Sequence, residues 1–166
     1  TLSPSSAASD VYKRQMEKIL TEGSEVLNTV SELVLQPQSE IGRFRHFLLD
    51  HGYRITAEDM VFEDGKYYPM MKAIRGEQCY EEEIEYLFGS ALLKNRNPVL
   101  TQFLLKEQSS VEKIMEHLKN TDTRTGRERL LELEQELFYI KKALGLDSSG
   151  QKPISGICQK HARQQI

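Results

Sequence analysis

The hydrophobic and polar positions of this chain change their period several times along its length. The first clear signal is the run Leu33–Leu35, three apolar residues without alternation, which is typical of a short strand buried on both faces. Gln36, Pro37 and Gln38 follow, and the proline ends the strand because it cannot donate a ladder hydrogen bond. The pattern therefore predicts a buried strand that ends in a polar segment.

A helix is predicted on each side of this strand. Residues 16–27 carry apolar side chains at mostly helical spacing, with Gly23 weakening the later part. After the strand, Ser39 can cap a second helix and Gly52 can end it. The apolar residues of that second helix recur on one face, at Ile41, Phe44, Phe47 and Leu48. This helix would return the chain to the same sheet.

The segment 53–74 predicts a β-hairpin. Its two extended runs are divided by Asp64 and Gly65, a pair that suits a type I′ turn because such a turn needs positive φ at both central positions. Pro69 falls inside the second run and would remove a ladder donor, so it should lie at an edge or a bulge. A strand, a crossover helix and a final antiparallel hairpin predict an α/β fold whose sheet ends like that of class I S-adenosylmethionine-dependent methyltransferases. Fold alone does not imply function.

After Gly76 the pattern changes to charged helices. Residues 81–95 predict a short helix with its acidic residues first, and Asn97 with Pro98 predicts the start of a long helix that runs to about Asn120. The apolar stripe of the long helix is Leu104, Val111, Ile114 and Leu118. The last helix has a heptad seam at Leu130, Leu133, Leu137, Ile140 and Leu144. Two such helices predict an antiparallel coiled-coil hairpin, with a dimer interface as the alternative use of the seam.

The two ends of the chain differ from the middle. Residues 1–15 are small and polar without either period, and residues 146–166 lack an apolar stripe, so both are predicted to be disordered. The stretch SSAASDVYKRQ at 5–15 also resembles the translation of a sequencing adapter, which would place the true start of the protein upstream of Met16. We therefore expect a lead (1–15), an α/β part (16–76), a helical hairpin domain (77–145) and a tail (146–166).

Composition narrows the classes of function. With 166 residues, 39% of them hydrophobic, the chain can hold one ordinary core. A formal charge of -3 excludes a uniformly basic nucleic-acid binder but allows a local basic patch. Cys79 and Cys158 match no metal-ligand spacing, which indicates a reduced, cytoplasmic setting. No run approaches the roughly 20 apolar residues of a membrane span, so we expect no membrane partner.

Motifs for metal or nucleophilic chemistry are not found in the sequence. His46 and His51 are five residues apart, whereas two ligands on one helical face stand four apart. There is also no P-loop and no nucleophile elbow. We therefore expect no metal, and no hydrolytic or nucleotide-driven reaction.

Several segments, taken in order, resemble the bacterial tRNA adenine-22 N1-methyltransferase family. These segments are LVLQPQ at 33–38, Arg45 within FRHFL, HGYRI at 51–55, EDGKYY at 63–68, LFGSALL at 87–93 and NPVL at 97–100. The resemblance runs from about Met16 to about Leu144. It implies a Rossmann-like domain that binds S-adenosylmethionine and methylates N1 of an adenine in tRNA, and a C-terminal helical hairpin that helps to hold the RNA.

The chain departs from the family pattern in two ways. The family commonly has Asn, Glu and Pro where Gln38, Pro69 and Ser90 stand. Its acidic-glycine cofactor motif and its Gly-Met-Gly-Gly segment are absent. The resemblance therefore implies a fragment that lacks the cofactor-binding half and is inactive alone. Intrachain packing of the heptad seam predicts that the chain is a monomer. The alternative from the residues alone is a non-catalytic coiled-coil interaction module or RNA-binding module.

Gln36, Pro37 and Gln38 are the candidate residues for positioning adenine. Ligands of open α/β sheets lie outside the carboxyl ends of the parallel strands, where this segment stands. An amide can donate to and accept from the Watson–Crick edge of adenine, and a proline ring can pack against a base. The simpler alternative is that Pro37 stops the strand while the two glutamines satisfy backbone groups.

The candidate RNA-binding residues lie in three places. Arg45 is on the helix after the strand, Lys66 and Tyr68 are beside the hairpin turn, and a basic group lies along the predicted helical hairpin at Lys113, Lys119, Arg124, Arg127 and Arg129. These side chains could contact phosphates, an interaction that weakens steeply with salt. Without the resemblance, the better interpretation is a solvated face interleaved with glutamates, and a charge and a ring that cover the sheet edge.

Overall fold

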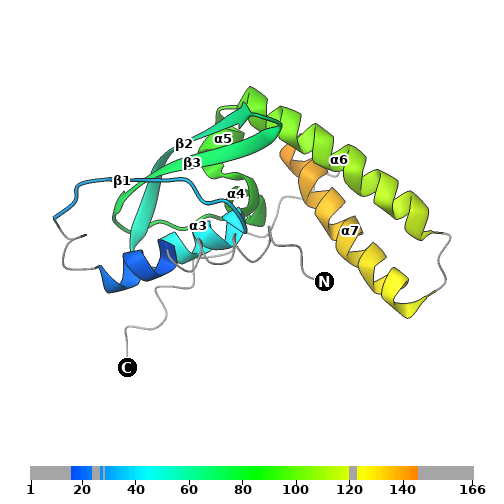
Figure 1. The fold of residues 1–166 in the computed structure, drawn as a ribbon, viewed down its shortest axis with the longest axis horizontal. Helices are drawn as coiled ribbons and strands as arrows, with labels where there is room; N and C mark the ends of the chain where they lie inside the picture. The colour runs from blue at the N-terminus through cyan, green and yellow to red at the C-terminus, as the bar shows by residue number, and fades with distance from the viewer. Residues whose placement is uncertain (1–15, 24–26, 28, 120–122, 146–166) are drawn as a thin grey trace.

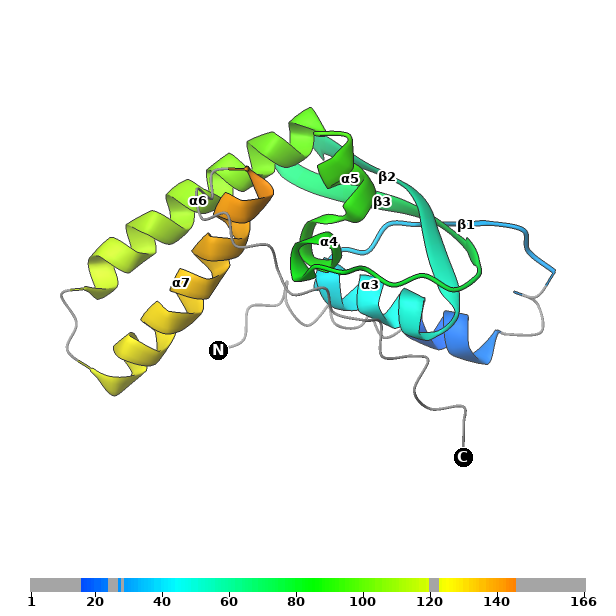
Figure 2. The ribbon, with the colours of Figure 1, turned by 180° about the vertical axis from the view of Figure 1, so that it is seen from behind.

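The computed structural model describes residues 16–23, 27, 29–119 and 123–145, so the predicted lead and tail lie outside the described residues. Figures 1 and 2 show an α/β part and a pair of long helices that projects from it. A helical segment at 16–22 comes first. It is followed by β1 (Leu33–Leu35), α3 (Ile41–Asp50), β2 (Tyr53–Glu63), β3 (Lys66–Arg75), α4 (Glu83–Phe88), α5 (Ser90–Lys94), α6 (Pro98–Leu118) and α7 (Arg124–Ala143). The α/β class agrees with the prediction.

The sheet has three strands in the order β1-β3-β2. β3 is antiparallel to both neighbours, with Leu35 opposite Met71 and Glu63 opposite Lys66. β1 and β2 therefore point the same way, as the strand–helix–strand pattern predicted. They are not neighbours, however, because the return strand of the hairpin lies between them.

β1 is an edge strand of the described sheet, and this position corrects the prediction that it is buried on both faces. Val34 is 73% exposed, whereas Leu33 and Leu35 pack against the core. Alternate residues of a strand point to opposite faces, and the described residues cover only one face of β1. The core on that face contains Leu20, Phe44, Leu48, Leu49, Tyr53, Ile55, Met71 and Ala73.

The hairpin turn has the predicted geometry. Asp64 and Gly65 have φ values of 48° and 77°, so both central positions are left-handed, as a type I′ turn requires. Pro69 faces Met60 of β2 and lies beyond the last pairing of β1 with β3. It therefore stands where β3 has one described neighbour, which is the local edge that proline needs. β2 also has an irregularity between Ile55 and Ala57.

The helical part differs from the prediction in two details. The expected single helix over 81–95 is divided into α4 and α5 at Gly89. Ile114, expected on the buried stripe of α6, is 45% exposed, and Met115 packs against the core instead. Asn97 caps α6 as predicted, accepting hydrogen bonds from the N–H groups of Val99 and Leu100.

α6 and α7 lie side by side and share a second core with the sheet (Figures 1 and 2). Its buried members are Met60, Leu92, Leu100, Leu104, Val111, Leu133 and Ile140. Because Met60 belongs to β2, this core fixes the helix pair against the hairpin. None of the helices in the described ranges combines the length and the apolar character needed to cross a bilayer.

Candidate functional site

The polar segment after β1 is held in an unusual backbone shape. Gln36 and Gln38 are exposed, and Pro37 between them is buried. Glu40 is left-handed, with φ of 46°, and forms the N-cap of α3, where its side chain makes no capping hydrogen bond to the helix. Ser39 was expected to cap this helix, but its buried Oγ has no hydrogen-bond partner within the described residues. A left-handed non-glycine residue costs about 1–3 kcal/mol and persists only where the surrounding structure enforces it.

A cavity of about 840 Å³ lies beside this segment, between the sheet and the helix pair. Gln38 and the start of α3 form one wall, β2 and β3 a second, and α6 and α7 a third. Its apolar lining includes Met60, Tyr67, Phe103 and Tyr139, and its carboxylates are Glu40, Glu83, Glu107, Glu132 and Glu136. Ligand pockets are typically concave and largely apolar, with a few polar groups that fix orientation. This cavity, with Gln38 at its margin, is the candidate binding site.

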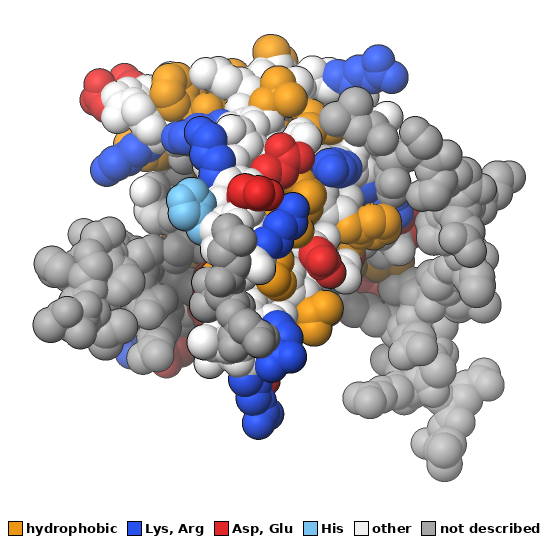
Figure 3. Space-filling view, turned by 90° about the vertical axis from the view of Figure 1, so that its right-hand side faces the viewer, with side chains coloured by type: hydrophobic (Ala, Val, Ile, Leu, Met, Phe, Trp, Pro, Cys, Tyr) orange, Lys and Arg blue, Asp and Glu red, His pale blue; other side chains and the backbone are white. Residues whose placement is uncertain are grey.

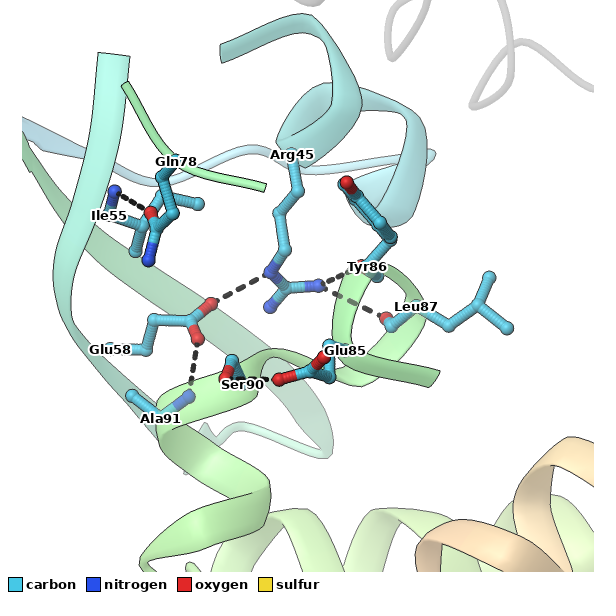
Figure 4. Close-up of polar contacts among 9 residues, drawn as sticks. All are labelled: Arg45, Ile55, Glu58, Gln78, Glu85, Tyr86, Leu87, Ser90 and Ala91. Atoms are coloured by element: carbon cyan, nitrogen blue, oxygen red, sulfur yellow. Dashed lines mark hydrogen bonds and ion pairs between the residues drawn. The ribbon is translucent and has the colours of Figure 1, made fainter. Parts of the chain in front are cut away.

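Arg45 is buried in this structure (Figure 4). Its side chain is 1% exposed, and its Nε donates to Glu58 Oε1 at 2.7 Å. Its Nη1 donates to the carbonyl oxygens of Tyr86 at 2.8 Å and Leu87 at 3.1 Å. The second oxygen of Glu58 accepts from the N–H of Ala91 at 3.1 Å. Nε and Nη1 of Arg45 are therefore used inside the protein, and the contact of Arg45 with RNA stays a prediction.

Gly89 permits the ion pair to approach the backbone. Its φ is 94°, and a Cβ there would lie 2.7 Å from each carboxylate oxygen of Glu58 and 2.8 Å from Nη2 of Arg45. Glycine is therefore required both by the positive φ and by the lack of space. The ion pair and this glycine together join four elements, α3, β2, α4 and α5, directly behind the candidate site.

Two other titratable groups lie near this ion pair. Burial, followed by the charge of Glu58, raises the pKa of the Tyr80 hydroxyl well above its usual range. Burial would also raise the pKa of Glu85, but hydrogen bonds from Ser90 and from the N–H groups of Glu82 and Glu81 outweigh it, so the pKa of Glu85 is lowered. Near neutral pH the first group is protonated and the second is ionised. Neither has the pKa near the working pH that suits a general base.

The described ranges contain no cluster of three or more His, Cys, Asp or Glu side chains placed to hold a metal ion. Around Gln38 the structure offers a cavity of defined shape, an amide group that can form hydrogen bonds, and a backbone with a left-handed residue at Glu40. These are the means by which a site positions a reactant.

The basic residues expected to contact RNA are spread over two regions. Lys66 is exposed and Tyr68 is half-buried beside the hairpin turn. The five on the helix pair are exposed: Lys113, Lys119, Arg124, Arg127 and Arg129. Within this group Lys119 pairs with Glu116 at 3.0 Å, Arg124 with Glu128 at 2.9 Å and Arg129 with Glu132 at 2.7 Å. Figure 3, which faces the far ends of α6 and α7, shows basic and acidic side chains interleaved there.

Sequence reasoning missed Glu58, the partner of Arg45. The only sequence signal was a carboxylate inside an otherwise extended run, close to Ile55 and Met60. An aromatic group at the junction of the hairpin and α6 was also missed. It consists of Phe62 and Tyr67, which pair across the hairpin turn, and Phe103, which is distant from both in the sequence.

Solved structures with the same arrangement define the class of this chain. A candidate tRNA (m1A22) methyltransferase from Streptococcus pneumoniae, solved in complex with S-adenosyl-L-methionine, is 30% identical with a TM-score of 0.66, over 79% of this chain and 55% of that one. A protein of the NADB-Rossmann superfamily from Streptococcus agalactiae is 27% identical with a TM-score of 0.67, over 81% of this chain and 56% of that one. The α/β fold of this chain therefore matches about half of each of these Rossmann-like proteins.

The particular family follows from the sequence match. The family model described as tRNA (adenine(22)-N(1))-methyltransferase matches residues 13–142, and the chain belongs to this family. The tRNA (adenine(22)-N(1))-methyltransferase of Bacillus subtilis (strain 168) is 26% identical over 132 residues, 76% of this chain and 56% of that protein. The resemblance seen in the sequence is confirmed, and the chain spans a little over half the length of the relatives it matches.

Proposed function

We propose that this chain is part of a cytoplasmic S-adenosylmethionine-dependent enzyme that methylates N1 of adenine 22 in tRNA. The observation that carries the proposal is the family match over residues 13–142. The position of Gln36–Gln38 at the carboxyl end of β1, next to the cavity, supports it, because ligands of open α/β sheets lie at such strand ends.

In this proposal the segment after β1 orients the adenine. S-adenosylmethionine, when bound, supplies the methyl group. The amide of Gln38 can donate to and accept from the Watson–Crick edge of the base, and Pro37 can pack against its face. N1 of adenine is a weak nucleophile that needs alignment with the methyl group more than it needs a base, so positioning supplies the catalysis.

The cofactor itself is assigned to no residue of this chain. The described connection from β1 to α3 reads QPQSE over 36–40 and contains no glycine, so it does not fit the glycine-rich turn that cradles a nucleotide cofactor. The exposed side chain of Val34 likewise offers no polar group to a cofactor. The described residues would contribute the adenine side of the site.

The helix pair would hold the tRNA. We propose that residues 77–145 form the hairpin domain, that α6 and α7 pack as a coiled coil through Leu104, Val111, Leu133 and Ile140, and that the exposed basic residues from Lys113 to Arg129 contact phosphates. Burial of these four apolar side chains supports the packing. The exposure of the basic residues is what phosphate contact requires.

A chimera tests the proposal directly. Residues 13–142 would replace the matching part of the Bacillus subtilis relative, and methyl transfer would be measured on tRNA transcripts with adenine or guanine at position 22. We expect methylation of the adenine transcript only. Substituting Gln38→Ala should lower the rate by about a hundredfold, the order of loss that follows from misplacing a reactant, without changing the melting temperature.

The outcomes separate the two candidate functions. A folded chimera that binds S-adenosylmethionine but leaves the adenine unmethylated contradicts the enzymatic proposal. If the chain alone then binds tRNA, the RNA-binding module becomes the better account of its function.

A further inference from the structure

An aromatic group forms the outer end of the cavity, where the hairpin meets α6. The rings of Phe62 and Tyr67 are 4.6 Å apart, and those of Tyr67 and Phe103 are 5.2 Å apart and nearly perpendicular. Tyr67 and Phe103 line the cavity, whereas Phe62 is 43% exposed. The three rings, called the aromatic wall below, thus run from the surface into the cavity.

Charge changes sign along this wall. Nζ of the exposed Lys106 lies 5.3 Å from the centre of the Tyr67 ring. Lys66, opposite Glu63 in the ladder, points to the other face of the hairpin from Phe62 and Tyr67. Further in, the side chains of α6 and α7 that line the cavity include Glu107 and Glu136. A phosphate is therefore favoured beside Lys106 and disfavoured beside Glu107 and Glu136. The exocyclic amino group of a base can donate to the inner carboxylates.

Nucleic-acid sites that bind unpaired strands combine these features. They place aromatic rings where bases stack and basic side chains along the backbone. An exposed phenylalanine in tilted contact with a tyrosine, with Lys106 over the tyrosine ring, has this composition. None of Phe62, Tyr67, Phe103 and Lys106 was singled out by the sequence.

We propose that the aromatic wall is a stacking site for an unpaired base of the tRNA, next to the base that is methylated. The base stacks on Phe62 and Tyr67 with its edge toward the carboxylates, and its phosphate stays at Lys106. This inference rests on the proposed function for the identity of the RNA. It assigns to the hairpin and the helix pair a contact with a base in addition to contacts with phosphates.

The test compares two probes on the full chain, a short oligoadenylate RNA and an abasic strand of the same length with the same phosphates. Binding is measured by fluorescence anisotropy. Stacking of one base predicts that the wild-type chain binds the oligoadenylate about tenfold more tightly than the abasic strand. Phe62→Ala should remove most of this difference. Because Phe62 is already partly exposed, this variant should keep its circular dichroism spectrum.

Phe138→Ala is the matched control, since Phe138 is 45% exposed on α7 and does not line the cavity. It should keep the tenfold preference. A second variant, Tyr67→Leu, keeps an apolar side chain and should also lose the preference. Equal affinity of the wild type for the two probes overturns the stacking site, as does an equal loss in Phe62→Ala and Phe138→Ala. An absence of binding to either probe overturns it as well and would leave the wall as a surface for a protein partner.

Failure of the stacking site can be told apart from failure of the proposed function. If the chimera methylates adenine 22 while the chain shows no preference for the oligoadenylate, the stacking site is wrong and the enzymatic assignment stands. If the chimera is inactive while the preference is present, the chain binds RNA through the wall without the proposed reaction.

Discussion

At the scale of single residues, the buried ion pair between Arg45 and Glu58 should be a large local determinant of stability. Replacing Glu58 with Gln leaves the guanidinium buried without a counter-charge, which costs about 3–5 kcal/mol of unfolding free energy. Glu132→Gln is the control, because Glu132 pairs with Arg129 at the same distance of 2.7 Å but in solvent. Exposed pairs contribute about 0–1 kcal/mol. Urea denaturation measures both, and equal losses would contradict the structural role given to Glu58.

Gly89 offers a second test of the same interaction. Gly89→Ala combines a strained φ with a Cβ placed 2.7 Å from the Glu58 carboxylate, so we expect a loss of more than about 2 kcal/mol. Gly65→Ala is the matched variant, since Gly65 has a φ of 77° but open space around it, and it should lose about 1 kcal/mol. Thermal unfolding of the two variants separates the stability lost through steric overlap of the new Cβ from the stability lost through positive φ. Similar melting temperatures would show that the close approach is unimportant.

The role of Arg45 could not be read from its position in the sequence. Spacing placed it one residue from an apolar face, and that position suits a surface arginine as well as a buried one. Its partner was hidden by the irregularity between Ile55 and Ala57, which shifts the alternation of β2 so that Glu58 turns inward with Met60. A shift of one residue changes which side chains face the core. The sequence does not reveal where such a shift occurs.

At the scale of elements, the sequence predicted those turns and helix ends that depend only on neighbouring residues. The Asp64–Gly65 turn and the Asn97 cap were found because each depends on residues within four positions of one another. The break at Gly89 was missed because its cause lies in Arg45 and Glu58, which are distant in sequence. The burial of β1 was also wrongly predicted, because exposure of Val34 depends on which elements cover the sheet.

The start of α4 should give the protein a measurable dependence on acid. Hydrogen bonds lower the pKa of Glu85 below its ordinary value of 4.5 in spite of burial. A depressed pKa means that the unfolded chain binds the proton more readily, so this stabilisation is present above the ordinary pKa and is lost as pH falls through the folded value. We expect Glu85→Gln to flatten the decline in unfolding free energy below about pH 4.5. Glu81→Gln, at an exposed side chain, should keep the decline, and urea titrations at several pH values decide.

At the scale of the whole molecule, charge is sorted by place even though the chain has a formal charge of only -3. Five carboxylates and the two arginines of α3 line the cavity, Lys106 lies over the Tyr67 ring at the hairpin end, and mixed charge covers the far end of α6 and α7. Composition alone could exclude a uniformly basic protein, but it could not locate these regions, because residues of each sign alternate along the helices. Under the proposed function, the partner that this charge distribution would bind is tRNA.

The far end of the helix pair gives the last prediction. Arg124→Glu with Arg127→Glu should weaken tRNA binding and lower the slope of log affinity against log salt by about one for each phosphate that the variant no longer neutralises. The control pair is Lys94→Glu with Arg96→Glu, which makes the same change of net charge just before the other end of α6. If binding at the far end is specific, the control should have the smaller effect on both affinity and slope. Equal effects in the two double variants would mean that net charge alone governs binding, and the helix pair would then have no assigned role in holding tRNA.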